Sequence, residues 1–568
     1  MSLQTLSYRQ KMILLVLGGV ILRATAFLNW NFGFDQVQIL EASKQIVAGH
    51  LTLIGPRTGP AEMFTGPLIY YINAIFFFFT HSYYSLVLTS LAIATITGVV
   101  LFVMVRRYIG KSEALWAVTL WSGSQFLISL DQTTWNPNLS LLSASLFFFP
   151  ISHLLQTKSV SKFDLASIFF GSFLAYQAHF SGLLLLPLAA IFLFAKQKRV
   201  GIFAIICTVC GFAVSLLPLV LFDLRHNWLN ARGLLTLISN LFQKDEVSTQ
   251  LHFLKQIWRS FYTAVESVGR VSFENSNLPV AILFVLGIIM VAIYILLARK
   301  NRLSKWLLPL LWIAITISSF SMYPGDTPPY YYLIMMPAVF VVLLTLLGFL
   351  PSLVRRTILG LFLLLVAGTQ ITAILPHNPF SITTALAIHS YTLSHSPTGK
   401  IQGLTYHMPE GNTFGLKYIF ENDLESASEA GSWLVSYPDE LAYADEHFSG
   451  IYTAKQPMLS ANEHLYQTNR VRFVTTGQLS LYENRYYQGD AERELLVQFD
   501  GKFVARIEEY SYRQATVKYP EIKVVKNTNW QTLTPTSFSS WYEPTDSVYV
   551  LTLDSEEELF SPDLIRMY

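Results

Sequence analysis

The run VGIFAIICTVCGFAVSLLPLVLF at residues 200–222 contains no charged side chain. A helix needs about 20 apolar residues to cross the ~30 Å hydrocarbon core of a bilayer, and this run is long enough. It also holds both cysteines of the chain, Cys207 and Cys210. Because a CxxC pair in hydrocarbon lacks polar partners, we interpret it as a packing feature rather than a redox or zinc motif. The run therefore predicts a membrane-spanning helix.

Similar apolar runs recur through the first two thirds of the chain. The sequence is 52% hydrophobic and 13% charged, and a typical soluble chain has roughly twice that charged fraction. The first run has basic flanks but no small-residue cleavage site, so we expect a retained span. We predict a polytopic α-helical membrane protein with about eleven spans, at roughly 12–28, 83–105, 113–130, 139–156, 165–177, 181–195, 200–222, 278–298, 306–320, 331–350 and 357–375.

The apolar run at 66–79 decides the topology. It is too short for a full span and suits a re-entrant or interfacial helix. If it does not cross, the short basic loops all fall on the cytoplasmic side, as the bias of Lys and Arg toward the inside requires. We therefore predict a helix embedded from the outer face, a cytoplasmic N-terminus, and outer loops at 29–82 and 223–277, in a plasma (inner) membrane.

The charge of the chain divides at about residue 375. Residues 1–375 hold 25 Lys+Arg and 12 Asp+Glu, a balance of +13, whereas residues 376–568 hold 14 and 25, a balance of −11. We predict a transmembrane domain over 1–375 and an extracytoplasmic soluble α/β domain over 376–568. The basic residues are scattered over loops, which argues against nucleic-acid binding. Within the second domain we expect strands at 431–437, 470–476, 515–520 and 546–553, and helices at 439–448 and 491–499.

An outward-facing site would be built on carboxylates, because this topology places ten of the twelve acidic residues of 1–375 outside. Asp35 follows the first span on an amphipathic segment that can lie along the membrane surface. A partly desolvated carboxylate there suits general-base catalysis, since its pKa can rise. The alternative is an ordinary helix-capping acid.

Other polar side chains of the outer segments are candidates for substrate binding. A rigid Gly- and Pro-rich loop carries Arg57 and Glu62, and the short loop 131–138 carries Asp131 and Asn136. His179 stands at another outer helix end, where capping or packing is the alternative role. Tyr331 belongs to a tyrosine cluster that fits either an aromatic membrane belt or a platform for a sugar ring.

Cations also gather at the predicted outer interface. Arg225 and His226 directly follow the 200–222 run, at the depth of lipid headgroups, where they suit a phosphate or pyrophosphate. The alternative is that they snorkel to ordinary lipid headgroups. Arg23, near the outer end of the first span, is costly there unless it has a partner.

Five segments in a fixed order carry a resemblance to a known family: FGFDQVQ (32–38), GPLIYY (66–71), YQAHFSGLLLLP (176–187), FDLRHNWLNAR (222–232) and PPYYYLIMMPA (328–338). Together they resemble the bacterial and archaeal branch of the C-type (GT-C fold) glycosyltransferases, often described as family 39-like. These membrane enzymes are akin to protein O-mannosyltransferases and aminoarabinose transferases. The resemblance covers roughly residues 10–350 of this chain.

The resemblance implies transfer of a sugar from a polyprenyl- or dolichyl-phosphate donor to an acceptor (glycan, lipid or protein) on the outer face, with inversion. It implies that Asp35 is the first-loop acid that acts as base or orients the acceptor, and that Arg225 and His226 face the lipid phosphate. Relatives often carry Asp-Pro where this chain has Asn136–Pro137. No metal ligand is therefore assigned, and whether a divalent cation takes part is left open.

Two other functions remain open from the sequence. A lipid-linked glycan transporter would use the same cations without a base, although the inverted repeats common in transporters are not visible. A non-catalytic scaffold would use residues 376–568 to bind a cell-wall partner. We find no Walker loop, GxSxG, HExxH or Rossmann fingerprint.

Overall fold

In the computed structural model the chain forms two compact units, Met1–Ile382 and Thr383–Tyr568. The structure describes residues 6–25, 30–57, 63–156, 160–194, 197–242, 259, 303–321, 323, 327–358, 360–361 and 378–396, and beyond residue 399 the helices and strands named below with a few flanking residues.

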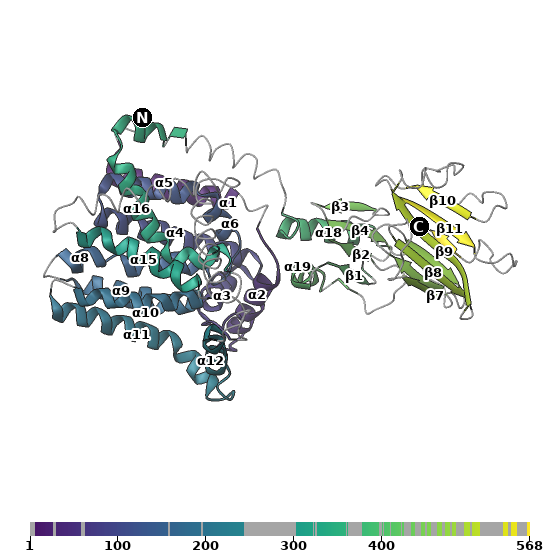
Figure 1. The fold of residues 1–568 in the computed structure, drawn as a ribbon, viewed down its shortest axis with the longest axis horizontal. Coiled ribbons are helices and arrows are strands. Elements are labelled where there is room, and N and C mark those ends of the chain that lie inside the picture. The colour runs from purple at the N-terminus through teal and green to yellow at the C-terminus, as the bar shows by residue number, and fades with distance from the viewer. Residues whose placement is uncertain are drawn as a thin grey trace. The chain divides into compact units, whose positions relative to one another are not determined.

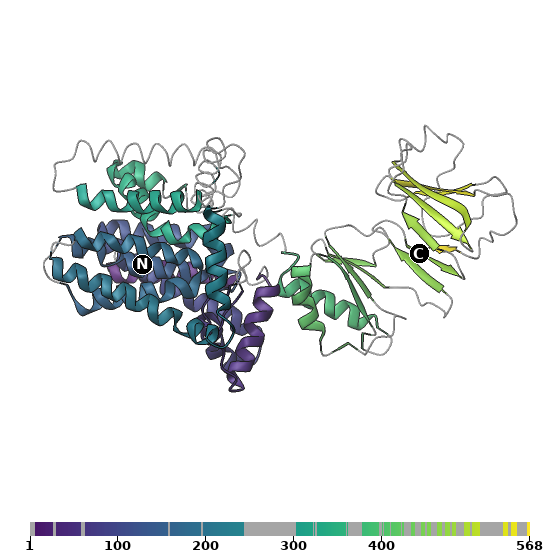
Figure 2. The same ribbon diagram turned by 60° about the horizontal axis from the view of Figure 1, so that its bottom comes forward.

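The first unit is a bundle of helices, and Figures 1 and 2 show its long members lying side by side. Helix α4 packs against α5 and α7, α7 packs against α9, and α9 packs against α11. The bounds of these and the first helix are Tyr8–Thr25 (α1), Tyr84–Tyr108 (α4), Lys111–Gly123 (α5), Asn138–Phe148 (α7), Lys162–Ala178 (α9) and Lys198–Asp223 (α11).

Glycines allow the central helices to approach closely. A Cβ atom on Gly171 of α9 would lie 2.7 Å from the backbone nitrogen of Phe147 on α7. A Cβ atom on Gly211 of α11 would lie 2.5 Å from the carbonyl oxygen of Phe169 on α9. Small residues at such crossings are typical of helices that associate by van der Waals packing within a membrane.

Three predicted spans are divided into shorter helices. The predicted span 113–130 becomes α5 and α6 (Gln125–Asp131), because Ser124 interrupts the helix and its Oγ accepts the Leu127 N–H as an N-cap. The predicted span 139–156 becomes α7 and α8 (Ile151–Gln156) on either side of Pro150. The predicted span 181–195 is a chain of short turns, η3 (Phe180–Leu184), α10 (Leu185–Leu188) and η4 (Ala189–Phe194).

Length and composition single out two of the described helices, α4 and α11, as able to cross a membrane. The remaining apolar helices of this part of the chain are shorter, and they include α15 (Leu303–Ser321) and η5–α16 (Pro329–Met335 and Met336–Phe349). The predicted span 278–298 and most of 357–375 lie outside the described residues. The count of eleven spans stays a prediction.

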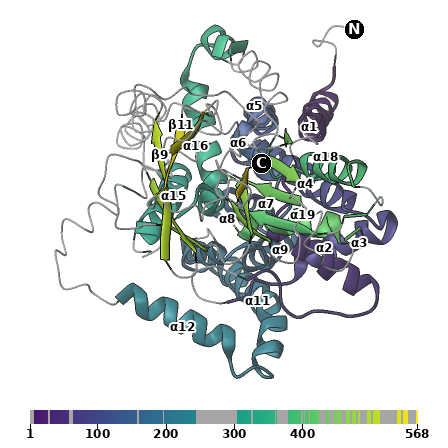
Figure 3. The same ribbon diagram turned by 90° about the vertical axis from the view of Figure 1, so that its right-hand side faces the viewer.

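The segment 29–82, predicted to be an outer loop, contains two packed helices. Helix α3 (Leu68–Thr80) covers the run expected to be re-entrant, and it packs against α2 (Phe34–Val47) at one end of the bundle, as Figure 3 shows. Ser43 Oγ on α2 donates to the carbonyl oxygen of Tyr70 at 3.1 Å and accepts from Asn73 Nδ2 at 2.9 Å. Helix α12 (Leu229–Phe242) follows α11 and extends away from the bundle (Figures 1 and 3).

The second unit combines helices with three sheets. A four-stranded sheet has the order β1-β2-β4-β3, a five-stranded antiparallel sheet has the order β10-β11-β9-β8-β7, and a three-stranded sheet has the order β12-β6-β5. Its helices are α18 (Ile382–Ser394), within which the unit begins, and α19 (Glu410–Phe420). The strands are Leu404–His407 (β1), Trp433–Ser436 (β2), Glu446–Phe448 (β3), Ile451–Lys455 (β4), Glu463–Gln467 (β5), Arg472–Thr476 (β6), Ser480–Glu483 (β7), Arg493–Phe499 (β8), Lys502–Ser511 (β9), Phe538–Tyr542 (β10), Ser547–Leu553 (β11) and Ile565–Met567 (β12).

Several strand predictions are confirmed, and both helix predictions fail where they can be compared. Strands β2, β6 and β11 occupy three of the four predicted strand segments, and 515–520 lies outside the described residues. The segment 491–499 was expected to be helical but forms β8, which pairs with β7 on one side and β9 on the other. The segment 439–448 was also expected to be helical, but the end of it that the structure describes forms strand β3. Pairing on both edges outweighs the helix preference of Glu, Arg and Leu in β8.

Candidate functional site

Asp35 lies in the first turn of α2, and the start of this helix is tied to the loop that follows α6. Gln36 Oε1 accepts the Gly33 N–H at 3.0 Å, while its Nε2 donates to the carbonyl oxygen of Thr134 at 3.0 Å. Trp30 Nε1 donates to the Thr134 hydroxyl at 3.2 Å. These buried bonds fix the position of Asp35 relative to residues 132–137.

The Gly- and Pro-rich loop that carries Arg57 is a narrow turn, as its sequence predicts. The Gly55 N–H donates to the carbonyl oxygen of Thr65, and the Thr65 N–H donates to that of Pro56, both at 2.9 Å. A Cβ atom on Gly55 would lie 2.1 Å from the carbonyl oxygen of Gly66. Only glycine therefore allows the two arms of the turn to meet at this distance. Glu62 lies outside the described residues.

A cavity of about 460 Å³, including the space at its open mouth, joins these elements. We call it the Asp35 cavity. Five of the predicted site residues line it: Asp35, Arg57, Asn136, His179 and Tyr331. Its other lining residues are Pro56, Thr65, Trp135, Pro137, Phe180 and Tyr330.

Asp35 is the acidic group of the cavity lining. Burial raises the pKa of its carboxyl group above the ordinary range. Within the described part of the chain, no hydrogen bond or ion pair forms to its carboxylate. A carboxylate that is half-buried and without a protein donor is a stronger base than a solvated one and can accept a proton from a bound molecule.

His179 is a neutral side chain between α9 and η3. Its Nδ1 accepts the Ser181 N–H at 3.2 Å, which leaves the ring proton on Nε2. The ring centroid lies 4.2 Å from that of Phe180 and 4.4 Å from that of Tyr331. Burial lowers the pKa of His179 to about 3. At neutral pH this imidazole can donate a hydrogen bond but carries no charge.

The remaining wall is aromatic and amide in character. Asn136 is buried, and its Nδ2 donates to the carbonyl oxygen of Ala178 at the end of α9. The rings of Trp135 and Tyr330 lie edge to face, with centroids 4.6 Å apart. Tyr331 is 5% exposed and sits within this wall. Flat apolar faces beside a few polar groups suit a sugar ring.

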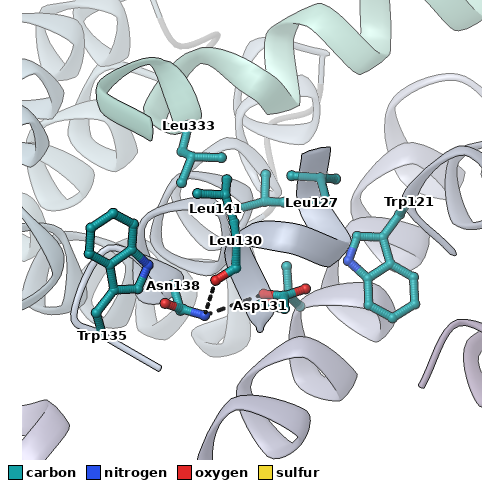
Figure 4. Close-up of a pocket in the computed structure, with 9 residues that line it drawn as sticks. Trp121, Leu127, Leu130, Asp131, Trp135, Asn138, Leu141 and Leu333 are labelled. Carbon is teal, nitrogen blue, oxygen red and sulfur yellow. Dashed lines mark hydrogen bonds between the residues drawn. The ribbon is translucent and has the colours of Figure 1, made fainter. Parts of the chain in front are cut away.

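Asp131 does not line the Asp35 cavity. Its Oδ2 accepts a hydrogen bond from Arg23 Nε at 2.6 Å, so Arg23 has the partner that its depth requires. Asp131 lines a second pocket of about 320 Å³, shown in Figure 4, together with Trp135 and Asn138. Trp135 lines both spaces.

Arg225 and His226 lie on an exposed turn after α11 and do not line the Asp35 cavity. The His226 ring stacks on Phe222 with centroids 3.9 Å apart, and its Nδ1 lies 2.8 Å from the Phe222 carbonyl oxygen. The predicted cation pair is therefore a surface feature of the first unit.

The end of α11 reaches the cavity through two residues that sequence reasoning did not select. Buried Asp223 accepts hydrogen bonds from the Asn230 N–H and Nδ2, both at 2.9 Å. Asn230 Oδ1 accepts the Phe64 N–H at 2.7 Å, next to cavity-lining Thr65. Asp223 and Asn230 stand seven residues apart, and no sequence motif links them to residue 64.

A metal centre is not evident in the described ranges, where no three His, Cys, Asp or Glu side chains gather as a set of ligands. Asp35 stands in the cavity without a second carboxylate from these ranges.

The structure is similar to ArnT from Cupriavidus metallidurans in the apo state, with a TM-score of 0.51 and 12% sequence identity, over 78% of this chain and 97% of that chain. This chain has the GT-C fold. The resemblance expected from its motifs is thus confirmed at the level of fold, since ArnT is an aminoarabinose transferase of that class.

Two further solved structures are more distant. ArnT from the same organism bound to undecaprenyl phosphate gives a TM-score of 0.48 at 12% identity, covering 78% of this chain and 97% of that chain. The Archaeoglobus fulgidus oligosaccharyltransferase in complex with Zn and sulfate gives 0.40 at 15% identity, covering 74% and 62%. No protein-family model matches the sequence. No curated protein matches it either.

Proposed function

We propose that this protein is a multi-pass membrane glycosyltransferase of the cell envelope. In this proposal it moves a sugar from a polyprenyl- or dolichyl-phosphate donor to an acceptor on the outer face of the membrane. The observation that carries the proposal is the Asp35 cavity, in which one partly buried carboxylate and Arg57 share a space in a GT-C fold. A base and a cation are the two groups that such a transfer needs.

The chemistry assigns a role to each group. Asp35 takes the proton of the acceptor nucleophile as that nucleophile attacks C1 of the sugar. The bond between C1 and the phosphate oxygen breaks, its electron pair stays on the phosphate, and the configuration at C1 inverts. Phosphate is a good leaving group, so the reaction requires charge stabilisation more than an acid. Arg57 supplies a guanidinium for the developing negative charge.

The other cavity residues bind the substrate in this proposal. Neutral His179 donates a hydrogen bond from Nε2, and Asn136 and Tyr331 form the wall against which a sugar ring packs. Arg225 and His226, exposed beyond α11, meet the phosphate of the donor before its sugar and phosphate enter the cavity. Glu62 is assigned to substrate binding because it belongs to the same loop as Arg57. No nucleotide takes part, and a divalent cation remains open to a chelation test.

The test uses the full chain in sealed proteoliposomes with undecaprenyl-phosphate hexoses and pentoses as donors. Release of undecaprenyl phosphate coupled to acceptor glycosylation, on the side that also exposes residues 376–568 to protease, is the expected result. Movement of the labelled lipid-linked sugar between leaflets without bond cleavage would instead identify a transporter. Repeating the assay with EDTA, followed by Mg²⁺ or Mn²⁺, decides whether a divalent cation is required.

A further inference from the structure

The second pocket contains a buried donor and a buried acceptor that no group of the described residues satisfies. Within the ranges that the structure describes, Trp135 Nε1 and Asn138 Oδ1 have no hydrogen-bond partner, and both atoms are shielded from solvent. Asn138 as a whole is 6% exposed. In Figure 4 the indole nitrogen of Trp135 and the amide oxygen of Asn138 are on the sides of these two side chains that face each other. Buried polar groups in native proteins nearly always have a partner, so two exceptions in the lining of one pocket call for an occupant.

The orientation of the Asn138 amide is fixed by its other contacts. Its Nδ2 donates to the carbonyl oxygen of Leu130 at 3.3 Å and lies 3.5 Å from Asp131 Oδ1, and Ser90 Oγ accepts from it at 3.2 Å. A flipped amide would place Oδ1 against the carbonyl and the carboxylate, where oxygen meets oxygen. The free atom of Asn138 is therefore an acceptor, and the free atom of Trp135 is a donor.

The charge in the pocket is already compensated. The Asp131 carboxylate is paired with the fully buried guanidinium of Arg23. The remaining lining is mostly apolar: Thr97, Trp121, Leu127, Leu130, Leu141 and Leu333. Thr97 Oγ1 already donates to the carbonyl oxygen of Ile93 at 2.8 Å. An occupant consequently needs no charge, and a charged one would be penalised by burial.

We propose that this pocket binds a hydroxyl oxygen, which accepts the Trp135 Nε1–H and donates its own proton to Asn138 Oδ1. A hydroxyl is the small neutral group that accepts and donates at a single atom. An ammonium group has no acceptor, and a carbonyl has no donor. The hydroxyl comes either from a buried water or from a sugar in the adjoining Asp35 cavity, because Trp135 forms part of both walls.

A double-mutant cycle on the full chain in nanodiscs tests the bridge without any turnover. Trp135→Phe removes the donor, Asn138→Leu removes the acceptor, and no direct hydrogen bond joins the two residues. If water bridges them, the losses in midpoint temperature are non-additive, because the first substitution already releases it. The matched control pairs Trp135→Phe with Thr97→Val, another pocket residue, and those losses should add.

The second arm adds undecaprenyl-phosphate hexoses and pentoses as probes. If the hydroxyl belongs to the sugar, the losses in midpoint temperature of the two substitutions add in the ligand-free protein. The rise in midpoint temperature that the sugar lipid produces should then be affected non-additively by the two substitutions. Undecaprenyl phosphate alone should show no such coupling. Additive losses with and without the sugar lipids would overturn the proposal.

A density map of the unmodified full chain covers the case in which a variant does not fold. The proposal predicts an oxygen within hydrogen-bond distance of both Trp135 Nε1 and Asn138 Oδ1, either alone or as part of the sugar lipid. A pocket that is empty in both preparations would overturn it.

Discussion

Arg23 on α1 and Asp131 at the end of α6 form an ion pair with an Nε–Oδ2 distance of 2.6 Å, and the Arg23 side chain is wholly shielded from solvent. The guanidinium also donates to the carbonyl oxygens of Gly19 at 3.0 Å and Trp121 at 3.1 Å. Its carbon lies 4.1 Å from the Trp121 ring centroid. The cation is thus bonded on three sides and stacked on an aromatic ring, which compensates for the loss of water.

Removal of one partner of this pair should destabilise the first unit strongly. Asp131→Leu leaves the Arg23 charge buried and unpaired, and such a loss costs about 3–5 kcal/mol. The double variant Arg23→Met with Asp131→Leu should recover much of that loss, because no charge is then stranded. Denaturant unfolding in detergent measures both. A single variant as stable as the wild type would show that the pair contributes nothing.

Activity should fall on the acid side at a higher pH than an ordinary aspartate would give. Burial raises the pKa of Asp35, whereas the unperturbed value is roughly 3.9. The base is active only when ionised, so transfer is lost as pH falls through the raised pKa. His179, with a pKa of about 3, does not titrate in that range. A profile of kcat/KM against pH should therefore show one acidic limb above pH 4, and a limb at or below that pH would contradict the assignment.

The same shift predicts that Asp35→Asn folds normally. A carboxyl group whose pKa is raised on folding disfavours the folded state at every pH above its unfolded pKa, because the folded state holds the charge poorly. The amide carries no charge, so Asp35→Asn should be at least as stable as the wild type at pH 7. Thermal unfolding in detergent checks this. A marked loss of stability would mean that Asp35 forms a structural contact.

His179 should make the protein sensitive to mild acid. Its folded pKa is lowered to about 3, and the unfolded value is roughly 6.5. Its contribution to stability is therefore complete above pH 6.5 and is lost as pH falls toward 3. His179→Gln, which retains an acceptor near Ser181, should flatten the slope of midpoint temperature between pH 6.5 and 4. An unchanged slope would assign the acid sensitivity to another group.

The link from α11 to the Arg57 loop should affect substrate binding from outside the cavity. Asn230→Leu leaves the Phe64 N–H without its acceptor and removes one of the donors to the Asp223 carboxylate, at a cost of about 1–3 kcal/mol in stability. We expect KM for the sugar lipid to rise more than kcat falls, because the loop that carries Arg57 and Thr65 loosens. Ser239→Ala, on exposed α12, is the control and should change neither constant. If Asn230→Leu had the kcat and KM of the wild type, this link would have no influence on the site.

The sequence predicted those parts of the molecule that depend on local pattern. Uncharged runs predicted α4 and α11. The basic loops placed Asp35, Arg57, Asn136, His179 and Tyr331 on one side of the membrane; these five residues line one cavity, and their side of the membrane stays a prediction. The pairing of residues distant in the chain was not predictable. Arg23 and Asp131 are 108 positions apart, and nothing in the sequence indicates that they form an ion pair.

Composition misled the prediction where tertiary pairing decided the outcome. The segment at 493–499 is rich in helix-forming residues, yet its neighbours β7 and β9 make it a central strand. Arg225 and His226 lie on an exposed turn outside the Asp35 cavity, and their role at the lipid phosphate stays a prediction.

The role of Asp35 as the catalytic base is tested by comparing Asp35→Asn with Glu41→Gln, which removes another carboxylate of the same helix. Both are assayed for sugar transfer from undecaprenyl-phosphate donors in proteoliposomes. We expect a loss of at least about 100-fold in kcat for Asp35→Asn, as for removal of a general base, and near wild-type transfer for Glu41→Gln. Full transfer by a correctly folded Asp35→Asn protein would contradict this role.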